Sequence, residues 1–177
     1  MAIGMPTGGE PIVLDMATSV MPVFKVAEAL IKGEILPPNV GYDAEGAPTQ
    51  DPKEILVSGA LMTFDRGPKS SGLALMVELL ANALTGGCLP GDPDNQNWGN
   101  LALAIDPDLL VGRESFLKNV DRAIACIKAL KQTDPAHGIH LPGELSFIRS
   151  EQAIATQELE INEELFCAYR ERILSRF

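Results

Sequence analysis

Three short loop segments carry the side chains that could do chemistry in this sequence. In "RGPKSSG", Arg66 and Lys69 stand just before a strongly apolar stretch, and Gly72 leaves room for backbone to approach a bound group. "DMATS" (Asp15–Ser19) offers two hydroxyls between an expected strand and an expected helix, and "LPGE" ends in Glu144. Cations and the N–H groups of helix starts favour phosphate, and a carboxylate can accept a hydrogen bond from a ribose hydroxyl.

Each segment taken alone also has an ordinary structural explanation. "DMATS" could be a plain helix cap, "RGPKSSG" a solvated surface loop, and Glu144 the first residue of a helix. The spacings of the Walker A loop and of GxGxxG are both absent, so neither a P-loop nor an ordinary Rossmann site is supported. His137 and His140 stand three apart without further ligands at metal-binding spacing, so we expect no metal site. No nucleophile elbow or Cys-His pattern appears, and no catalytic residue is assigned.

Composition excludes several classes of partner. The chain has 177 residues, enough for one domain with a core, and 24 acidic residues stand against 14 basic ones. This acidic balance argues against binding to nucleic acid or to an anionic membrane surface. Glu78 interrupts the longest apolar stretch, and no signal peptide is recognisable, so we expect a soluble cytoplasmic protein. The three widely spaced cysteines favour neither a disulfide framework nor a zinc site.

The segments are set among strands and helices that alternate along the chain. The apolar run Ile12–Leu14 predicts a buried strand that ends at Asp15. The stretch Gly72–Leu84 predicts a helix that is apolar on almost every side and therefore covered on nearly all of them. The remaining expected elements are a helix from Val23 to Gly33, a strand over Leu101–Asp106, and helices over Arg113–Lys131, Glu144–Gln157 and Glu163–Leu174. This alternation predicts a layered α/β fold for residues 1–177 as a single domain.

In this order, the segments resemble the type 2 malate/L-lactate dehydrogenases. The resemblance rests on "PTGGEPIVLDMATS", "GYDAEGAPTQDP", "FDRGPKSSGLALMVELLANALTGG", "LALAIDPDL" and "LPGE" and covers nearly the whole chain. It implies an oxidoreductase that transfers hydride between NAD or NADP and a small 2-oxo or 2-hydroxy acid. It also implies a non-Rossmann, three-layer α/β fold with a mixed sheet flanked by helices, and usually a dimer.

The resemblance also assigns cofactor contacts, residue by residue. The "LDMATS" turn would hold the dinucleotide, the lysine of the glycine-rich segment would lie at it beside the apolar helix, and the "LPGE" turn would close over it. The cofactor-binding residues implied are Asp15, Met16, Ala17, Thr18, Ser19, Pro68, Lys69, Gly143 and Glu144.

The sequence departs from the family pattern at several points. The family commonly has "HKG" where this chain has "PKS", and often an arginine where His140 precedes "LPGE"; both bear on the choice between NAD and NADP. Family members are about twice as long and carry their catalytic histidine, the proton donor, in an N-terminal half. We therefore expect a fragment that is inactive alone and acts as a homodimer or together with such an N-terminal half. The alternative is a non-catalytic domain for dinucleotide binding or partner association.

Overall fold

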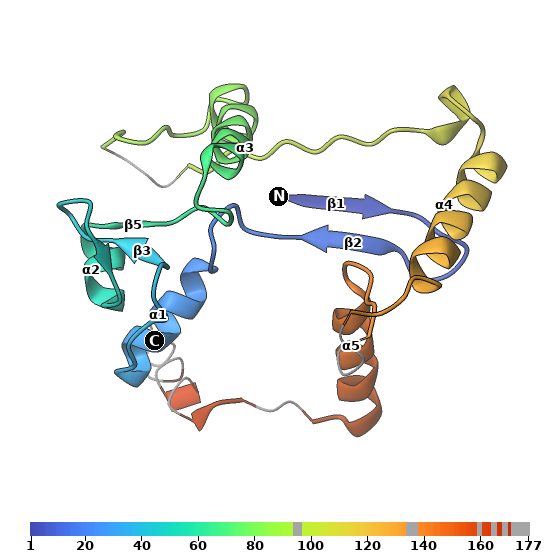
Figure 1. Ribbon diagram of the computed structural model, residues 1–177. Helices are drawn as coiled ribbons and strands as arrows, with labels where there is room; N and C mark the ends of the chain where they lie inside the picture. The colour runs from blue at the N-terminus through green and yellow to red at the C-terminus, as the bar shows by residue number, and fades with distance from the viewer. Residues whose placement is uncertain (94–96, 134–137, 159–160, 164–165, 168–169, 171–177) are drawn as a thin grey trace. The chain divides into compact units, whose positions relative to one another are not determined.

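The computed structural model describes residues 1–93, 97–133, 138–158, 161–163, 166–167 and 170 (Figure 1). Helices and short strands alternate, which confirms the α/β class. The chain divides into two compact units. The first unit comprises residues 1–16 and 101–158, and the second comprises residues 17–100 and 159–177. Each unit holds some of the sequence-predicted site residues.

The first unit is built on a hairpin of two strands. Strand β1 (Ala2–Met5) pairs antiparallel with β2 (Ile12–Asp15), with Ala2 opposite Asp15. The loop of the hairpin is tied to a helix, because the Gly8 N–H donates to Asp121 Oδ1 over 3.0 Å. The other elements are a short 3₁₀ helix (Pro107–Leu109), α4 (Arg113–Lys128) and α5 (Glu144–Thr156).

Two expected helices appear in the first unit, but an expected strand does not. Helix α5 begins at Glu144, as the sequence predicts, and α4 ends three residues earlier than expected. Residues 101–106 are not a strand, and no hydrogen bond joins the backbone of Leu101–Ile105 to any described residue. The short apolar run there is consistent with a strand, but strand formation also needs a neighbour to receive its hydrogen bonds. The last expected helix, Glu163–Leu174, lies largely outside the described residues.

The second unit has a small hydrophobic core of its own. Helix α1 (Val23–Lys32) ends at Gly33, whose φ of 67° is the left-handed conformation that suits glycine at a helix end. Helix α1 packs against α2 (Pro52–Val57). Helix α2 in turn contacts β3 (Gly41–Tyr42) and β5 (Ala60–Leu61) of a three-stranded antiparallel sheet, in the order β4 (Pro48–Thr49), β3, β5. The core is formed by Val26, Ala29, Leu36, Val40 and Ile55.

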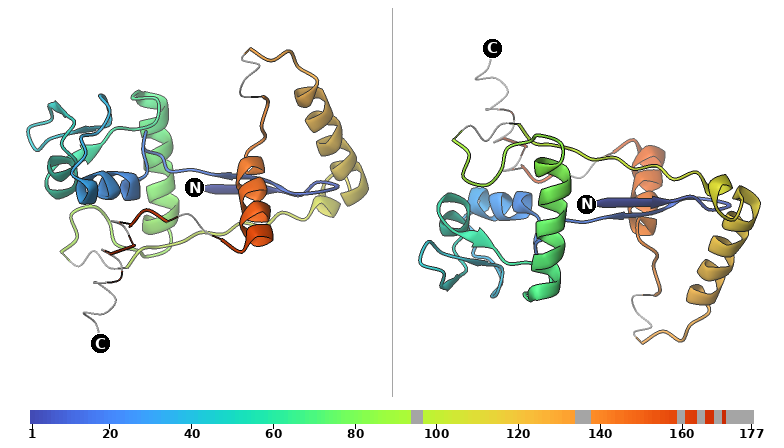
Figure 2. Two further views of the ribbon diagram at one scale, coloured as in Figure 1. Left: turned by 90° about the horizontal axis from the view of Figure 1, so that it is seen from below. Right: turned by 90° about the horizontal axis from the view of Figure 1, so that it is seen from above.

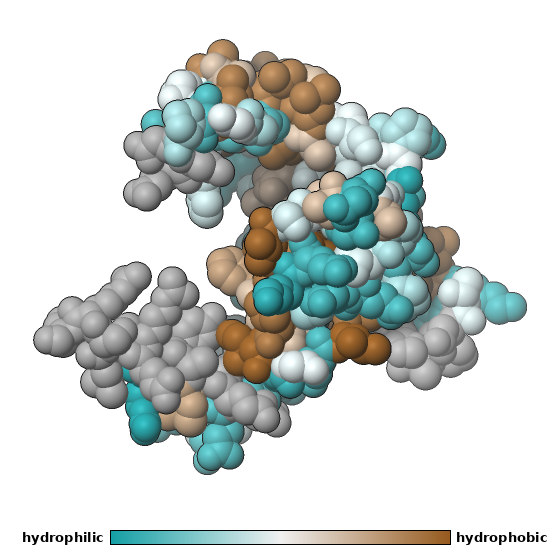
Figure 3. Space-filling model, turned by 90° about the vertical axis from the view of Figure 1, so that its left-hand side faces the viewer, coloured by the Kyte–Doolittle hydropathy of each residue, from teal (hydrophilic) through white to brown (hydrophobic). Residues whose placement is uncertain are grey.

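The apolar helix of the second unit is not covered as the sequence predicts. Helix α3 (Pro68–Glu78) continues as a π-helical turn over Leu79–Ala83, and Ser70 is its one buried residue. Leu75 is 56% exposed and Leu84 is 67% exposed. Hydrophobic side chains gather over α3 in Figure 3. The helix carries its own apolar side chains on nearly all sides, so it has no single face to bury. The described residues supply too few neighbours to cover all of these side chains.

Both sheets of the described residues are antiparallel, so the expected three-layer mixed sheet is not formed within them. No described helix combines the length and the apolar character needed to cross a bilayer.

Candidate functional site

In the second unit, two of the sequence-predicted segments lie side by side. The Val20 N–H donates to the Met62 carbonyl over 2.9 Å, and the Phe64 N–H donates to the Thr18 carbonyl over 3.1 Å. Ser19 pairs with Thr63 in an antiparallel bridge between these bonds. The end of "DMATS" is therefore fixed by backbone hydrogen bonds to the segment that leads into "RGPKSSG".

A carboxylate already occupies the start of α3. Asp65 Oδ1 accepts from the Gly67 N–H over 2.7 Å, from the Ser70 N–H over 3.4 Å, and from the Ser70 hydroxyl. The hydrogen bond from the Ser70 side chain, followed by the backbone N–H groups, holds the pKa of Asp65 below its ordinary value. A bound phosphate would therefore find these helix-end N–H groups taken by Asp65, and would have to rely on other donors.

Lys69 is the donor that remains available beside this cap. Pro68 is the first residue of α3, where its missing N–H costs nothing, and Lys69 follows it. Lys69 is exposed, and its ammonium makes no hydrogen bond or ion pair with any described residue. Arg66 is less free, because its Nε donates to the Asn39 carbonyl over 3.0 Å. Lys69 can therefore meet an anion without first breaking a contact.

In the first unit, the "LPGE" turn is fastened to β2. The Val13 N–H donates to the Pro142 carbonyl over 3.1 Å, on the strand that runs into "LDMATS". Gly143 has a φ of 87°, and a Cβ at this position would lie 3.0 Å from the Val13 carbonyl oxygen. Both the conformation and the close approach require glycine here.

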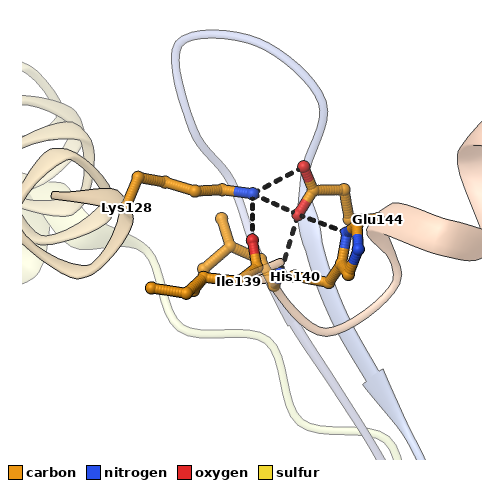
Figure 4. A network of polar contacts seen from close by, with 5 residues as sticks. Lys128, Ile139, His140 and Glu144 are labelled. Carbon is orange, nitrogen blue, oxygen red and sulfur yellow. Dashed lines mark hydrogen bonds and ion pairs between the residues drawn. The ribbon is translucent and has the colours of Figure 1, made fainter. Parts of the chain in front are cut away.

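Glu144 is the centre of a polar network that holds the same turn (Figure 4). Lys128 Nζ donates to Glu144 Oε1 over 2.7 Å, to Glu144 Oε2 over 2.6 Å, and to the Ile139 carbonyl over 2.7 Å. The Leu141 N–H donates to Glu144 Oε2 over 2.7 Å, and His140 Nδ1 lies 3.8 Å from the same oxygen. The hydrogen bond from Lys128, and after it that from the Leu141 N–H, lower the pKa of Glu144.

Lys128 is a member of this network that the sequence does not single out. It lies in the last turn of α4, where a lysine is ordinary because it complements the helix dipole. Its partner Glu144 comes 16 residues later, so no short-range spacing links the two side chains. Only the fold brings them together.

A cavity lies beside the network within the first unit. Its volume is about 460 Å³, in the range of small-molecule sites. The turn and α4 contribute Pro142, Glu144 and Lys128, while Ile12 and Phe147 supply apolar surface.

The remaining candidates lie where β2 ends. Asp15 is exposed, and Met16 is half-buried with its N–H donating to the Met1 carbonyl over 3.0 Å. These two residues belong to the first unit with Gly143 and Glu144, whereas Ala17 belongs to the second unit, as do Thr18, Ser19, Pro68 and Lys69. Within the described ranges, no three His, Cys, Asp or Glu side chains gather closely enough to hold a metal ion. His137 lies outside those ranges.

Comparison with known proteins identifies one family over nearly the whole chain. The family model described as malate/L-lactate dehydrogenase matches residues 1–168. The Δ1-pyrroline-2-carboxylate/Δ1-piperideine-2-carboxylate reductase of Pseudomonas syringae pv. tomato is 37% identical over 163 residues, which are 87% of this chain and 45% of the reductase. The L-sulfolactate dehydrogenase of Methanothermobacter thermautotrophicus is 34% identical over 180 residues, covering 98% of this chain and 49% of the relative.

Solved structures give the same result. The crystal structure of Δ1-piperideine-2-carboxylate reductase from P. syringae aligns with a TM-score of 0.72 at 34% identity, over 93% of this chain and 50% of the other. The sulfolactate dehydrogenase of Methanocaldococcus jannaschii aligns with the same TM-score at 30% identity, over 93% and 48%. The chain thus spans about half the length of the relatives it matches.

Proposed function

Because this chain belongs to the malate/L-lactate dehydrogenase family, we propose that it is the dinucleotide-binding part of an NAD(P)-dependent oxidoreductase. The substrate class is a small 2-oxo or 2-hydroxy acid, or a cyclic imino acid of the kind that the P. syringae relative reduces. The single observation that carries the proposal is Lys69, an exposed ammonium without a partner among the described residues, beside a segment tied to "DMATS".

The residues of the second unit fit an anionic dinucleotide. Asp65 takes the N–H groups of Gly67 and Ser70, so the positive charge available to a pyrophosphate is the side chain of Lys69. The backbone bonds from Val20 to Met62 and from Phe64 to Thr18 hold the segment that leads into α3 in place. Lys69 then binds and orients the phosphates without reorganising its surroundings, which lowers the cost of binding.

The residues of the first unit offer groups that fit the sugar part of a dinucleotide. Gly143 keeps the turn free of a side chain, so backbone can approach a bound group closely. Glu144 uses its carboxylate mainly to hold the turn, because Lys128 and the Leu141 N–H take three of about four lone-pair positions. The remaining position on Oε1 can accept a hydrogen bond from a ribose hydroxyl.

The cofactor supplies hydride, and the described residues bind and position it. Reduction of a carbonyl also requires a proton at the developing alkoxide. His140 faces Glu144 in the turn network, and we assign it no role as the donor. We place the donor histidine in the polypeptide that corresponds to the unmatched half of the relatives, and we expect little or no turnover by this chain alone.

Several finer features belong to the same proposal. The three-layer mixed sheet would form when that further polypeptide packs against this chain. The active form would be a homodimer or an assembly with the other half, in the cytoplasm. The choice between NAD and NADP depends on whether a cation near the cofactor, such as Arg66, meets a 2′-phosphate.

Titration of the chain with NADH and NADPH tests the proposal, followed by energy transfer from Trp98, the single tryptophan. We expect saturable binding that weakens about tenfold in Lys69→Ala, because a charge-assisted hydrogen bond contributes about 1.5 kcal/mol. Lys53→Ala removes another exposed lysine, from the first turn of α2, and is the matched control. Equal affinity of wild type and Lys69→Ala for both dinucleotides would contradict the site. Binding without any turnover after the other half is added would favour the non-catalytic alternative.

A further inference from the structure

The start of α3 holds two opposite charges, one of which is fixed by hydrogen bonds. In Figure 2, α3 is the green helix that follows β5 along the chain. Lys69 is its second residue, and the ammonium has no partner among the described residues. The carboxylate of Asp65, just before α3, bonds to backbone N–H groups of the same turn. No described ion pair joins the two side chains, so neither charge cancels the other by direct contact.

The position of the Asp65 carboxylate is set by the fold. Its Oδ1 accepts from the Gly67 N–H over 2.7 Å, from the Ser70 N–H over 3.4 Å, and from the Ser70 hydroxyl. The Asp65 N–H donates in return to Ser70 Oγ over 3.4 Å. Ser70 is fully buried, whereas Asp65 is exposed. A buried anchor therefore holds a solvent-facing negative charge at the first turn of α3.

An anion that approaches Lys69 meets this negative charge as well. Pro68 has no N–H, and the Ser70 N–H already donates to Asp65. Among the first three residues of α3, only Lys69 still offers an N–H together with its ammonium. The carboxylate also offsets the positive end of the helix dipole, which would otherwise attract phosphate. The hydrogen bond from the Ser70 side chain lowers the pKa of Asp65, so this charge persists at neutral pH.

We propose, building on the dinucleotide site of the proposed function, that Asp65 limits the affinity of this site. Its fixed charge weakens the attraction between Lys69 and the pyrophosphate, and so allows the cofactor to leave after hydride transfer. A nicotinamide cofactor is exchanged between its oxidised and reduced forms in each turnover, and slow release of a ligand can limit the rate. Asp65 provides this limit without loosening α3, because the carboxylate that carries the charge also caps the helix.

A second aspartate in the same unit offers a matched control. Asp51 caps α2 by accepting from the Lys53 N–H over 2.7 Å, and Lys53 is exposed like Lys69. The two caps have the same chemistry, but only the cap of α3 lies at the proposed site. Asparagine keeps an accepting oxygen at either position and removes the charge. Asp65→Asn therefore separates the charge from the cap, and Asp51→Asn makes the same change away from the site.

Titration of the 177-residue chain with NADH and NADPH, at low and at high salt, tests the proposal, with dissociation followed by stopped flow. We expect Asp65→Asn to bind both dinucleotides about two- to fivefold more tightly at low salt, mainly through slower dissociation. The gain should shrink at high salt, because ions screen exposed charges. Asp51→Asn should leave both affinities unchanged.

Hydrogen exchange of the Ser70 amide shows whether the cap survives in Asp65→Asn. Asp65→Ser is a second neutral variant, since a serine hydroxyl can also accept from N–H groups at a helix start. Binding that neither neutral variant tightens would overturn the role of Asp65 alone, as would an equal gain in Asp51→Asn. Failure of the wild type and of both neutral variants to bind either dinucleotide would contradict the proposed function, and the role of Asp65 with it.

Discussion

The two units of this chain differ in how they bury apolar side chains. The second unit has a core in which Val26 is fully buried and Ile55 is 4% exposed. Among the described residues of the first unit, none reaches that degree of burial. The first unit is organised by hydrogen bonds around the Gly143–Glu144 turn and the hairpin, and its Leu103 is 82% exposed. The difference indicates that a core of its own stabilises the second unit, whereas the described part of the first unit relies more on polar contacts.

Truncation of the core should give the largest effect. Ile55→Ala leaves a cavity between α1 and α2, and we expect it to lower the free energy of unfolding of the second unit by about 2–5 kcal/mol. Leu103→Ala removes a similar volume from the exposed surface of the first unit and should cost less than about 0.5 kcal/mol. Urea denaturation measures both losses, with hydrogen exchange followed in α1 for the second unit and in α4 for the first. Similar losses for the two variants would remove the contrast between the units.

The turn of the first unit should be the next most sensitive. Gly143→Ala puts a side chain on a left-handed backbone and places its methyl group 3.0 Å from the Val13 carbonyl oxygen. We therefore expect the substitution to destabilise the turn by about 1–2 kcal/mol. Gly72→Ala is the matched control: its Cβ would meet no atom within 4 Å, and alanine should stabilise α3 by up to about 1 kcal/mol. Hydrogen exchange in the turn and in α3 shows whether each substitution lowers or raises the local stability. A neutral Gly143→Ala would contradict the tight packing of this turn on β2.

The smallest effect we expect is the loss of the Glu144 hydrogen-bond network at acid pH. The folded chain lowers the pKa of Glu144 from 4.5, so the network is fully present above that pH. It is lost as the pH falls through the lower folded value, because a protonated carboxyl no longer attracts Lys128. We expect the Leu141 amide to exchange faster once its acceptor is protonated.

Two variants sharpen this test. Lys128→Met should remove most of the protection at neutral pH, and Glu144→Gln should remove its acid dependence. An acid response that survives in Glu144→Gln would assign it to another group.

The sequence predicts the elements whose signals are local. Helix α5 follows from its start at Glu144, and α1 follows from apolar spacing closed by Gly33. The strand predicted over Leu101–Asp106 is wrong because periodicity describes a face but cannot supply a neighbouring strand. The expectation of a covered apolar helix is wrong for a similar reason, since the described residues supply too little surface to cover α3.

The motifs of the candidate site can be predicted from the sequence, but the residues that hold these motifs in place were not. Segments around Thr18 and Phe64 meet as neighbouring backbones, and "LPGE" meets β2 at Val13. Asp65 as the cap of α3 and Lys128 as the anchor of Glu144 were not predicted. Asp65 caps the helix through residues only two and five positions along the chain, so its contacts are local. Lys128, in contrast, meets a residue 16 positions along the chain. Assignment of the cofactor contacts stays a prediction.

Reconstitution of turnover tests the central claim most directly. The chain, the unmatched portion of the P. syringae reductase, and their mixture are each given NADPH or NADH with Δ1-piperideine-2-carboxylate, and loss of the reduced nicotinamide absorbance is followed. We predict no turnover by either part alone, and turnover by the mixture that falls in Lys69→Ala but not in Lys53→Ala. Turnover by this chain alone at the rate of the mixture, or none by a mixture that demonstrably associates, would contradict the account.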